Sequence, residues 1–348
     1  MNARMTLLEW SLVVLLAAIW SFSYLFNRVA LDDLPVVTVV LGRVGIGALA
    51  LAFYLRFRRV ALPRGGGVWA GLFLLALLNN VFPFLLIVGG QTRIDSGLAA
   101  ILLGVSPLVS LILSRLVGGE ERMTPARIGG LALGLVGLAV LVGPAALSGL
   151  GGDLLGQVMV LGAATSYAAA ALYGRRFRGH DPYAVATGQL LCSTAVVLPL
   201  AAIVDAPWTL SPGWLAWGAI LGIALLATSV AYVLYFRILA TAGATNLLLV
   251  TLLVPPGAVL WGTLLLGERI AWTGLVGMAL IILGLVVLDG RAGERLRRAV
   301  GRLTVDAKRA PQGAPARQFL GRNIRQAAEP PLQIVLYLPF EIRSRTTI

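Results

Sequence analysis

Apolar residues gather in ten runs along the chain, and each run is long enough to cross a bilayer as a helix. A spanning helix needs about 20 mostly apolar residues, and short polar segments separate the runs. The predicted spans are 8–27, 36–56, 67–88, 94–116, 126–145, 154–174, 183–204, 214–236, 243–266 and 271–289. The pattern therefore predicts an all-α polytopic membrane protein with ten transmembrane helices.

One stretch of this pattern occurs twice, at 96–143 and again at 244–290. Each copy contains an apolar helix interrupted by a proline, then a Gly-Glu turn, then an apolar helix that carries glycines. The matched positions are Pro107 with Pro255, Gly119 with Gly267, Glu120 with Glu268, Arg122 with Arg269, Gly130 with Gly277, Gly137 with Gly284 and Gly143 with Gly290. Duplicated hydrophobic halves are typical of transporters, so the repeat indicates that class.

Five predicted spans lie before the linker 146–153 and five lie after it. An odd number of spans in each repeat makes the second copy enter the membrane from the opposite side, so the two five-helix repeats are inverted. The sequence therefore predicts a first repeat at 8–145, a second repeat at 154–290 and a separate tail at 291–348.

Arginines are distributed unevenly between alternate loops. One set of loops holds twelve arginines, whereas the other holds only Arg28, Arg93 and Arg269. Basic residues concentrate in the cytoplasmic loops of membrane proteins. The asymmetry therefore predicts an integral protein of a bacterial-type inner membrane, with both termini in the cytoplasm.

The tail at 291–348 differs from the rest of the chain because it is basic and has no run long enough to span. Two interpretations stay open: a cytoplasmic tail that touches anionic lipid, and a disordered extension. Its Pro/Gly/Ala-rich segment at 310–315 and its general composition favour the disordered extension.

Composition supports the membrane class and excludes several others. Hydrophobic residues make up 58% of the chain and charged residues 12%, with a mean hydropathy of +0.89, whereas soluble domains carry about 25% charged residues. Cys192 and His180 are each the only residue of their type, which excludes an intramolecular disulfide and disfavours zinc sites and His-based triads. Membrane orientation accounts for the net charge of +13, so we expect no nucleic-acid partner and no cofactor.

Several polar and aromatic side chains lie inside the predicted spans, where lipid offers them no hydrogen bonds. The candidate substrate-binding residues are Trp20, Tyr24, Asn79, Asn80, Tyr232 and Asn246. Two interpretations stay open for them: they line a substrate site, or they join helices by packing and hydrogen bonds. For Trp20 and Tyr24, a position away from the end of the span favours the substrate site.

Arg43 is the only basic residue well inside a predicted span. An intramembrane arginine is a functional candidate, so contact with substrate is one interpretation. Arg43 also lies about 10 Å from the end of its helix, so a side chain that snorkels to the interface or pairs with Asp32, Asp33 or Asp95 is the other.

Prolines and glycines add detail to the spans. Pro107 and Pro255 are predicted to be hinges that bend the fourth and ninth spans at symmetry-related positions, because proline removes a helical hydrogen bond. Glycines in the fifth and tenth spans predict close packing of those helices. They are Gly130, Gly134, Gly137, Gly274, Gly277 and Gly284.

The chain contains no HExxH, Gly-x-Ser-x-Gly or P-loop motif and no paired carboxylates inside a span, so the sequence does not predict an enzyme. All acidic residues lie at span ends, in loops or in the tail. Proton-coupled carriers commonly relay protons through an acid within the membrane. Facilitated or exchange transport therefore fits best, with coupling through a rim carboxylate such as Asp95 or Glu268 as the alternative.

Three short segments carry a family resemblance: Leu-Gly-Glu-Arg at 266–269, Gly-Gly-Glu-Glu-Arg at 118–122, and Ala-Ala-Ile-Trp-Ser-Phe-Ser-Tyr at 17–24. With the repeats, they make residues 8–290 resemble the EamA-like ten-helix family of the drug/metabolite transporter superfamily. Arg43 stands where such proteins often have an arginine, whereas the extra acidic Glu121 departs from the pattern. The resemblance implies a basket-like fold around a central cavity, export of amino acids, metabolites or drugs, and no catalytic residue.

The main hypothesis is a secondary transporter that exports a small organic metabolite or drug across the inner membrane by alternating access. Its partners are then the small-molecule substrate and the lipid bilayer. The alternatives are an intramembrane lipid-modifying enzyme and a non-transporting scaffold or sensor whose active part is the basic tail. Deletion of 291–348 separates the first hypothesis from the last, because a transporter keeps its activity without the tail.

Overall fold

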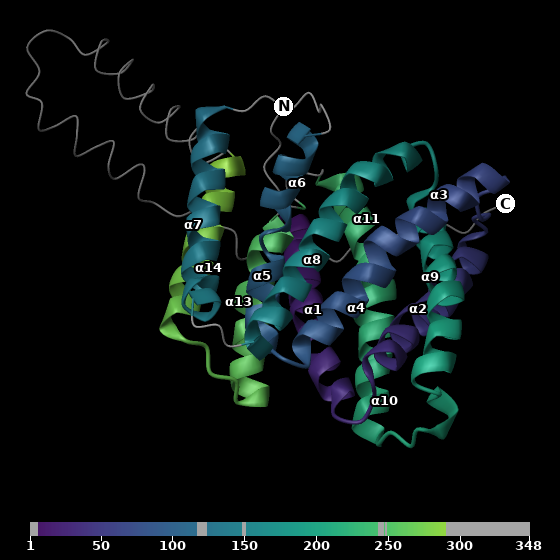
Figure 1. The fold of residues 1–348 in the computed structure, drawn as a ribbon. Coiled ribbons are helices and arrows are strands. Elements are labelled where there is room, and N and C mark those ends of the chain that lie inside the picture. Colours follow the sequence, from purple (N-terminus) through teal and green to yellow (C-terminus); the bar gives the residue numbers. More distant parts are fainter. Residues whose placement is uncertain (1–5, 117–123, 148–150, 243–246, 248, 290–348) are drawn as a thin grey trace, which may run out of the picture. The chain divides into compact units, whose positions relative to one another are not determined.

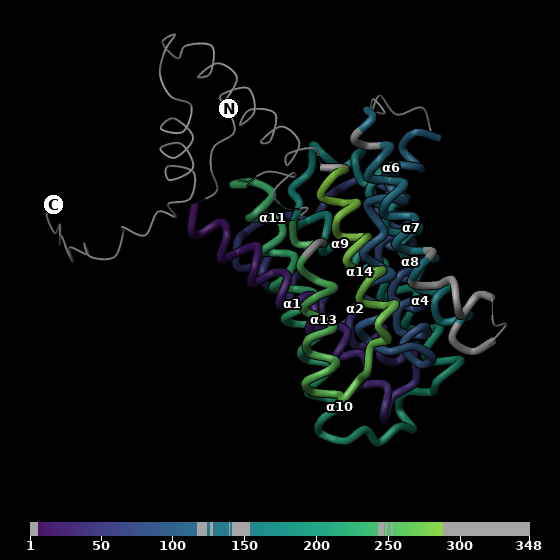
Figure 2. Tube along the Cα trace, turned by 90° about the vertical axis from the view of Figure 1, so that its left-hand side faces the viewer, coloured from purple at the N-terminus to yellow at the C-terminus, as the bar shows by residue number. Residues whose placement is uncertain are grey.

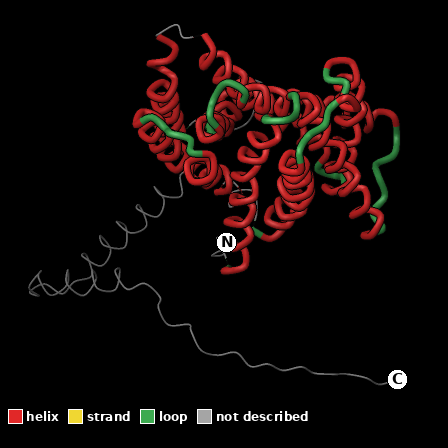
Figure 3. The backbone as a smooth tube through the Cα atoms, turned by 90° about the horizontal axis from the view of Figure 1, so that it is seen from below, coloured by secondary structure: helices red, strands yellow, loops and turns green. Residues whose placement is uncertain are grey.

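A computed structural model of the chain describes residues 6–116, 124–147, 151–242, 247 and 249–289. Within these ranges every regular element is a helix, and no strand occurs (Figure 3). The predicted site residue Asn246, the first Gly-Glu turn and the tail at 291–348 lie outside the described residues.

The described elements follow one another along the chain as helices joined by short loops (Figure 1). The first half contains α1 (Leu7–Leu31), α2 (Val36–Arg58), α3 (Gly66–Ala76), η1 (Leu77–Val81), α4 (Phe82–Gln91), α5 (Ser96–Leu103), α6 (Ser106–Leu116) and α7 (Pro125–Leu147). The second half contains α8 (Gly151–Gly174), η2 (Arg175–Phe177), α9 (Pro182–Val204), η3 (Pro207–Thr209), α10 (Trp214–Leu221), η4 (Gly222–Val230), α11 (Ala231–Thr241), α13 (Leu249–Leu266) and α14 (Trp272–Asp289).

Eight helical segments of the described chain are long and apolar enough to cross a membrane. They are Leu7–Leu31, Val36–Arg58, Gly66–Gln91, Ser96–Leu116, Leu154–Phe177, Pro182–Val204, Trp214–Thr241 and Leu249–Leu266. The helices α7 and α14, at the predicted fifth and tenth spans, contain shorter apolar stretches at Ile128–Leu138 and Trp272–Val287. The predicted class, an all-helical polytopic membrane protein, is confirmed for the described residues.

Local sequence signals explain where two of the helices begin. Thr6 caps α1 through a capping box with Glu9, in which each side chain bonds to the backbone of the other residue. Asp181 caps α9 by accepting from two backbone N–H groups, and Pro182 follows at the first helical position, where its missing N–H costs nothing.

The apolar side chains form two large cores between the helices. One core lies among α2, α4, α9 and α10 and includes Leu51, Val88 and Leu190. The other lies among α5, α8 and α13 and includes Ile101 and Ala163. The main helix contacts outside the α7–α14 pair are those of α2 with α9 and η4, of α1 with α13, and of α4 with α8.

The helices α7 and α14 pack side by side with their backbones in contact (Figures 1 and 2). A Cβ added at Gly137 would lie 2.9 Å from the carbonyl oxygen of Gly277, and a Cβ added at Gly284 would lie 2.7 Å from the carbonyl oxygen of Gly130. Both distances are too short for a side chain. The close packing that the glycines predict is therefore confirmed at these positions.

The two proline-bearing spans differ in the structure. The fourth span is divided into α5 and α6, which are separated at Gly104 and Val105 just before Pro107, whereas α13 continues through Pro255. The two regions touch, because a Cβ at Gly104 would lie 3.3 Å from Cγ of Pro255. Symmetry-related bends at the two prolines stay a prediction.

Candidate functional site

Two π-helical segments interrupt the third and eighth spans and carry the polar side chains of the candidate site. The segment η1 contains Asn79 and Asn80, and η4 contains Thr228 and Ser229. A π turn is wider than an α turn and occurs frequently at functional sites. Pro83 is the second residue after η1, and because it lacks a backbone N–H it favours a local departure from α-helical bonding there.

An amide cluster forms where η1, α9 and α11 meet. Asn79 Nδ2 donates to Gln189 Oε1 at 3.1 Å, and Asn80 Nδ2 donates to Ser193 Oγ at 3.0 Å. The Tyr232 hydroxyl accepts from Gln189 Nε2 at 3.3 Å and donates to Asn80 Oδ1 at 3.4 Å. Asn80 and Ser193 are fully buried. The structure thus brings three of the predicted site residues together and bonds them across three helices.

Arg43 points into the protein and does not snorkel to the end of its helix. It is 8% exposed, and its Nε donates to Thr228 Oγ1 of η4 at 3.1 Å. The guanidinium carbon lies 3.8 Å from the ring centroid of Phe84 in α4. The side chain therefore sits between three spans, on an aromatic face.

Three phenol groups from different helices lie near enough to this guanidinium to interact with it electrostatically. The electrostatic neighbours of Arg43 are Tyr167 of α8, Tyr232 of α11 and Tyr24 of α1. Tyr167 packs against both apolar cores, and Tyr24 is 5% exposed. Tyr232 also belongs to the amide cluster, so Arg43, Phe84, the three phenols and the amide cluster form one central cluster.

Trp20 does not join the central cluster. Trp20 lies one helical turn before Tyr24, and its ring centroid is 6.0 Å from that of Tyr235. It packs against the apolar residues of α1, α11 and α13 instead. Asn246 lies outside the described residues. The roles of both residues in substrate binding stay predictions.

Sequence reasoning missed four members of the central cluster: Phe84, Tyr167, Gln189 and Ser193. Gln189 and Ser193 are four residues apart, so they share one helix face, and this spacing was the available signal. A polar side chain in the middle of α8 was the corresponding signal for Tyr167. Phe84 has no signal, because one aromatic residue among apolar neighbours does not stand out.

A second polar region lies where α1, α4 and α5 meet the end of α13. Gln91, 1% exposed, accepts from Asn27 Nδ2 at 2.8 Å and donates to Ser96 Oγ at 3.1 Å. Glu268 accepts from the backbone N–H groups of Ser96 at 3.0 Å and Gly97 at 3.1 Å. Its carboxylate therefore caps the start of α5 from a distant part of the chain.

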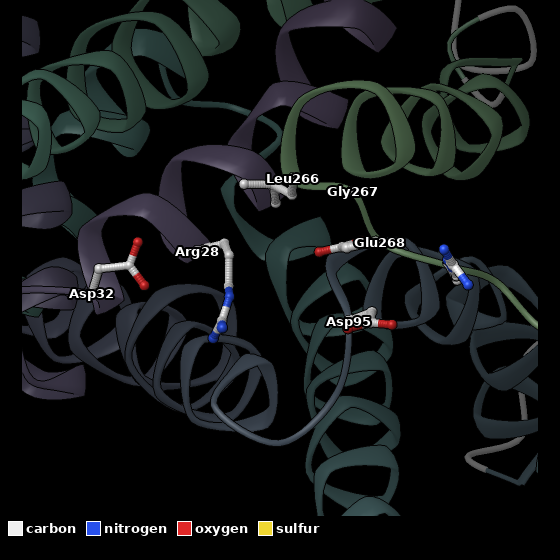
Figure 4. A pocket seen from close by; sticks show the side chains of 7 residues that line it. Arg28, Asp32, Asp95, Leu266, Gly267 and Glu268 are labelled. Carbon is white, nitrogen blue, oxygen red and sulfur yellow. The ribbon is translucent and has the colours of Figure 1, made fainter.

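Beside Glu268 lies a pocket of about 480 Å³ with charges of both signs. It is lined by Arg28, Asp32, Asp95, Leu266, Gly267, Glu268 and Arg269. Figure 4 shows Arg28 and Asp32 on one helix, with Glu268 and Asp95 across from them. The pocket contains both rim carboxylates that the sequence offered as alternative coupling groups.

Comparison with known proteins gives this geometry a family context. The EamA-like transporter family model matches the chain twice, at residues 8–143 and 154–288. The uncharacterized transporter YoaV of Bacillus subtilis is 25% identical over 78% of this chain and 94% of its own length. A probable terminal-alkyne amino-acid exporter of Streptantibioticus cattleyicolor is 26% identical over 83% of this chain and 96% of its own length.

Two further comparisons agree with that context. An uncharacterized protein of Pseudomonas aeruginosa is 33% identical over 85% of this chain and 99% of its own length. One solved structure shares the fold with a TM-score of 0.59 at 19% identity, over 80% of this chain and 96% of that one. The two family-model matches together cover most of the chain, and the chain therefore belongs to the EamA-like transporter family.

Proposed function

We propose that this chain is a secondary transporter that exports a small organic metabolite or drug across the inner membrane by alternating access. The amide cluster carries the proposal, because Asn79 and Asn80 come from the first family-model match and Gln189, Ser193 and Tyr232 from the second. A polar site shared between two halves is the place that rocking of the halves exposes to each side in turn.

The names of relatives support the direction and the membrane. One relative is named as a probable exporter of an amino acid. Another, YedA of Escherichia coli, is named as an inner membrane transporter and is 27% identical over 83% of this chain. We extend both features to this chain, and the arginine-rich loops support a cytoplasmic location for both termini.

The contacts between α7 and α14 support two inverted five-helix repeats within a ten-helix chain. The repeat aligns Gly130 with Gly277 and Gly137 with Gly284. Gly137 lies against Gly277, and Gly284 lies against Gly130, so exchanging the two copies reproduces the same contact. Such reciprocity is the property of a two-fold axis. The contact order also runs in opposite directions along the two helices, which fits an axis in the membrane plane.

The π segments support the same symmetry. If the register that aligns Ser96 with Ala244 is continued backwards, Asn80 of η1 falls opposite Thr228 of η4. Asn80 bonds to a helix of the other half through Ser193, and Thr228 bonds to a helix of the other half through Arg43. We propose that these widened turns are the points at which each half moves against the other.

Mutation of the glycine contact tests the symmetry. Gly137→Ala and Gly284→Ala each place a methyl group against backbone, so we expect both to lower stability by a similar amount, about 1–3 kcal/mol for overpacking. Gly129→Ala in the same helix is the control, because no atom lies within 4 Å of its added Cβ. Strongly unequal effects of the two variants on the melting temperature would contradict a two-fold contact.

Transport by purified protein in liposomes tests the function. We expect release of a subset of compounds from liposomes loaded with a metabolite extract, and a loss of release in Asn80→Ala of about 10-fold or more, because a buried hydrogen-bond partner is removed. Thr165→Ala is the control, since this exposed side chain bonds only to its own helix. If no compound leaves, or if Tyr24→Ala and Asn80→Ala release it like the parent, the proposed site is wrong.

Coupling is tested in the same liposomes. No carboxylate contacts the central cluster among the described residues, so we propose facilitated or exchange transport. An imposed pH gradient is then expected to drive no accumulation. Strong accumulation that persists when Asp95 and Glu268 are neutralised singly would contradict this and indicate a different proton site.

A further inference from the structure

We propose that the substrate carries a single carboxylate and that this group binds Arg43 at the centre of the protein. The inference deepens the proposed transport function and rests on it. It assigns a chemical class to the transported compound, an organic monocarboxylate, and assigns its recognition to Arg43 together with the hydroxyl groups of Tyr24 and Tyr167.

The first support is the missing counter-charge. A buried charge is normally paired, because an isolated ion loses its hydration without compensation. Arg43 is 8% exposed, and its contacts in the described chain are one hydrogen bond from Nε to Thr228 and the ring face of Phe84. Neither terminal nitrogen bonds to a described residue. The two terminal nitrogens of the Arg43 guanidinium therefore make no hydrogen bond to a described residue and can bind a ligand.

The second support is the set of donors near that guanidinium. The phenols of Tyr24 and Tyr167 are electrostatic neighbours of the guanidinium, and neither hydroxyl makes a hydrogen bond to a described residue. Arginine binds carboxylates through two parallel N–H groups. In the proposed complex the two hydroxyls donate to the same carboxylate that the guanidinium binds.

The third support is that three carboxylates elsewhere in the described chain already bond to backbone N–H groups. Asp33 accepts from the backbone N–H of Gly213 at 2.8 Å, and Asp205 accepts from the backbone N–H of Thr38 at 2.7 Å. Glu268 caps the start of α5. None of the three bonds to Arg43, and no carboxylate is among the contacts of Arg43 with described residues.

The charge balance selects a monoanion. Arg43 is the only cation in the central cluster among the described residues, and its other members are phenols, amides, a hydroxyl and an aromatic ring. One positive charge neutralises one carboxylate, whereas a phosphate dianion would keep an unpaired charge in a low-dielectric region. Tyr232 connects the guanidinium to the amide cluster, which is placed to bind the polar remainder of the compound.

The first test identifies what the protein moves. Liposomes with the full chain are loaded with a deproteinised cell extract, and released compounds are identified by mass spectrometry, before and after methyl esterification of the extract. We expect the compounds that leave faster than from protein-free liposomes to carry a carboxylate, and their methyl esters to leave no faster than from protein-free liposomes. Release of compounds without a carboxylate overturns the inference and leaves the transport function standing. Release of nothing overturns both.

The second test removes the cation. Arg43→Gln is expected to weaken the apparent affinity for the released carboxylate by roughly 10- to 100-fold, the effect of losing charge-assisted hydrogen bonds, with Arg43→Lys between it and the parent. Arg56→Gln is the matched control, an exposed arginine of the same helix. Tyr24→Phe and Tyr167→Phe are each expected to weaken affinity by a few fold. Parent-like affinity in Arg43→Gln or in both tyrosine variants overturns the inference.

A stability measurement separates binding from a structural role. If Arg43 is an unneutralised cation, Arg43→Met removes a buried charge and is expected to leave the melting temperature unchanged or raise it while carboxylate release is lost. A lower melting temperature together with lost release indicates that Arg43 supports the fold, and overturns the inference.

Discussion

Charges at the helix starts and the charge at the centre of the protein are compensated in opposite ways. Three carboxylates, Asp33, Asp205 and Glu268, accept hydrogen bonds from backbone N–H groups at or near the starts of α10, α2 and α5. Each of them comes from a loop outside the helix that it stabilises. Arg43 has no such partner, because the described residues near it are neutral.

The difference separates a structural role from a binding role. A helix start offers unpaired N–H groups and the positive end of the helix dipole, so a carboxylate there is satisfied by backbone alone. The three carboxylates at the helix starts therefore connect segments that are distant in the sequence. The guanidinium of Arg43 lies between helices, where no free backbone group compensates its positive charge. In the proposed mechanism the bound substrate supplies the compensating negative charge.

The largest effect is expected from a variant that places a carboxylate next to Arg43. Thr228→Asp places an acid where the hydroxyl now lies, 3.1 Å from Nε of Arg43. We expect carboxylate transport to fall at least about 10-fold, since the new ion pair competes with the substrate for one cation. Liposome release measures the loss.

Thr228→Asn is the matched control for that variant, because asparagine has nearly the same shape as aspartate and carries no charge. We expect it to keep most of the activity. If both variants lose transport equally, the hydroxyl of Thr228 matters for its bond to the Ile223 carbonyl in η4, and competition for Arg43 is not the cause.

The next effect concerns the best-connected rim carboxylate. Glu268→Ala leaves the N–H groups of Ser96 and Gly97 without their partner, so we expect the free energy of unfolding to fall by about 1–2 kcal/mol, as for loss of a helix cap. Glu268→Gln keeps one accepting oxygen and is expected to lose less. Thermal unfolding in detergent measures both, and an equal loss would point to the charge itself rather than to the cap.

The sequence predicts the membrane part of this fold well, and physical reasons explain what it misses. Apolar runs fix the spans because lipid tolerates little else, and Asn79, Asn80 and Tyr232 stand out within them. The partners Gln189 and Ser193 depend on which helices meet, which one sequence does not state. No proline comes just after η4, and the segment keeps an ordinary apolar pattern, so no periodicity argument finds its wider turn.

Alternatives for Arg43 show the same limit. From its depth in the span, a snorkelling side chain, a partner such as Asp33 and a substrate contact were equally compatible with the sequence. The contacts with Thr228 and Phe84 direct the guanidinium inward, and Asp33 binds Gly213 instead. The depth of Arg43 in its span does not predict the direction of its side chain, because that direction depends on the rotamer and on the neighbouring helices.

A smaller effect is expected at Asp205, which binds both the backbone N–H and the hydroxyl of Thr38 at 2.7 and 2.8 Å. Asp205→Asn keeps an acceptor but removes the charge at the start of α2, so we expect a loss of about 0.5–1 kcal/mol that shrinks as salt is added. Thermal unfolding at low and high salt measures it. A loss that does not depend on salt would mean that hydrogen-bond geometry, rather than charge, stabilises this helix start.

The smallest effect is expected at Asp33, and it sets the lower limit of the comparison. Its bond to the backbone N–H of Gly213 is exposed to solvent, so water and salt screen the interaction and replace it easily. Asp33→Asn is therefore expected to cost only about 0.3–0.5 kcal/mol and to leave carboxylate release unchanged. A matched double variant with Asp205→Asn is expected to lose the sum of the two single effects, because the two carboxylates bind different helices. A loss of transport in Asp33→Asn without a loss of stability would contradict the distinction between structural carboxylates and the substrate-binding Arg43. Asp33 would then act on the substrate as well as on a helix start.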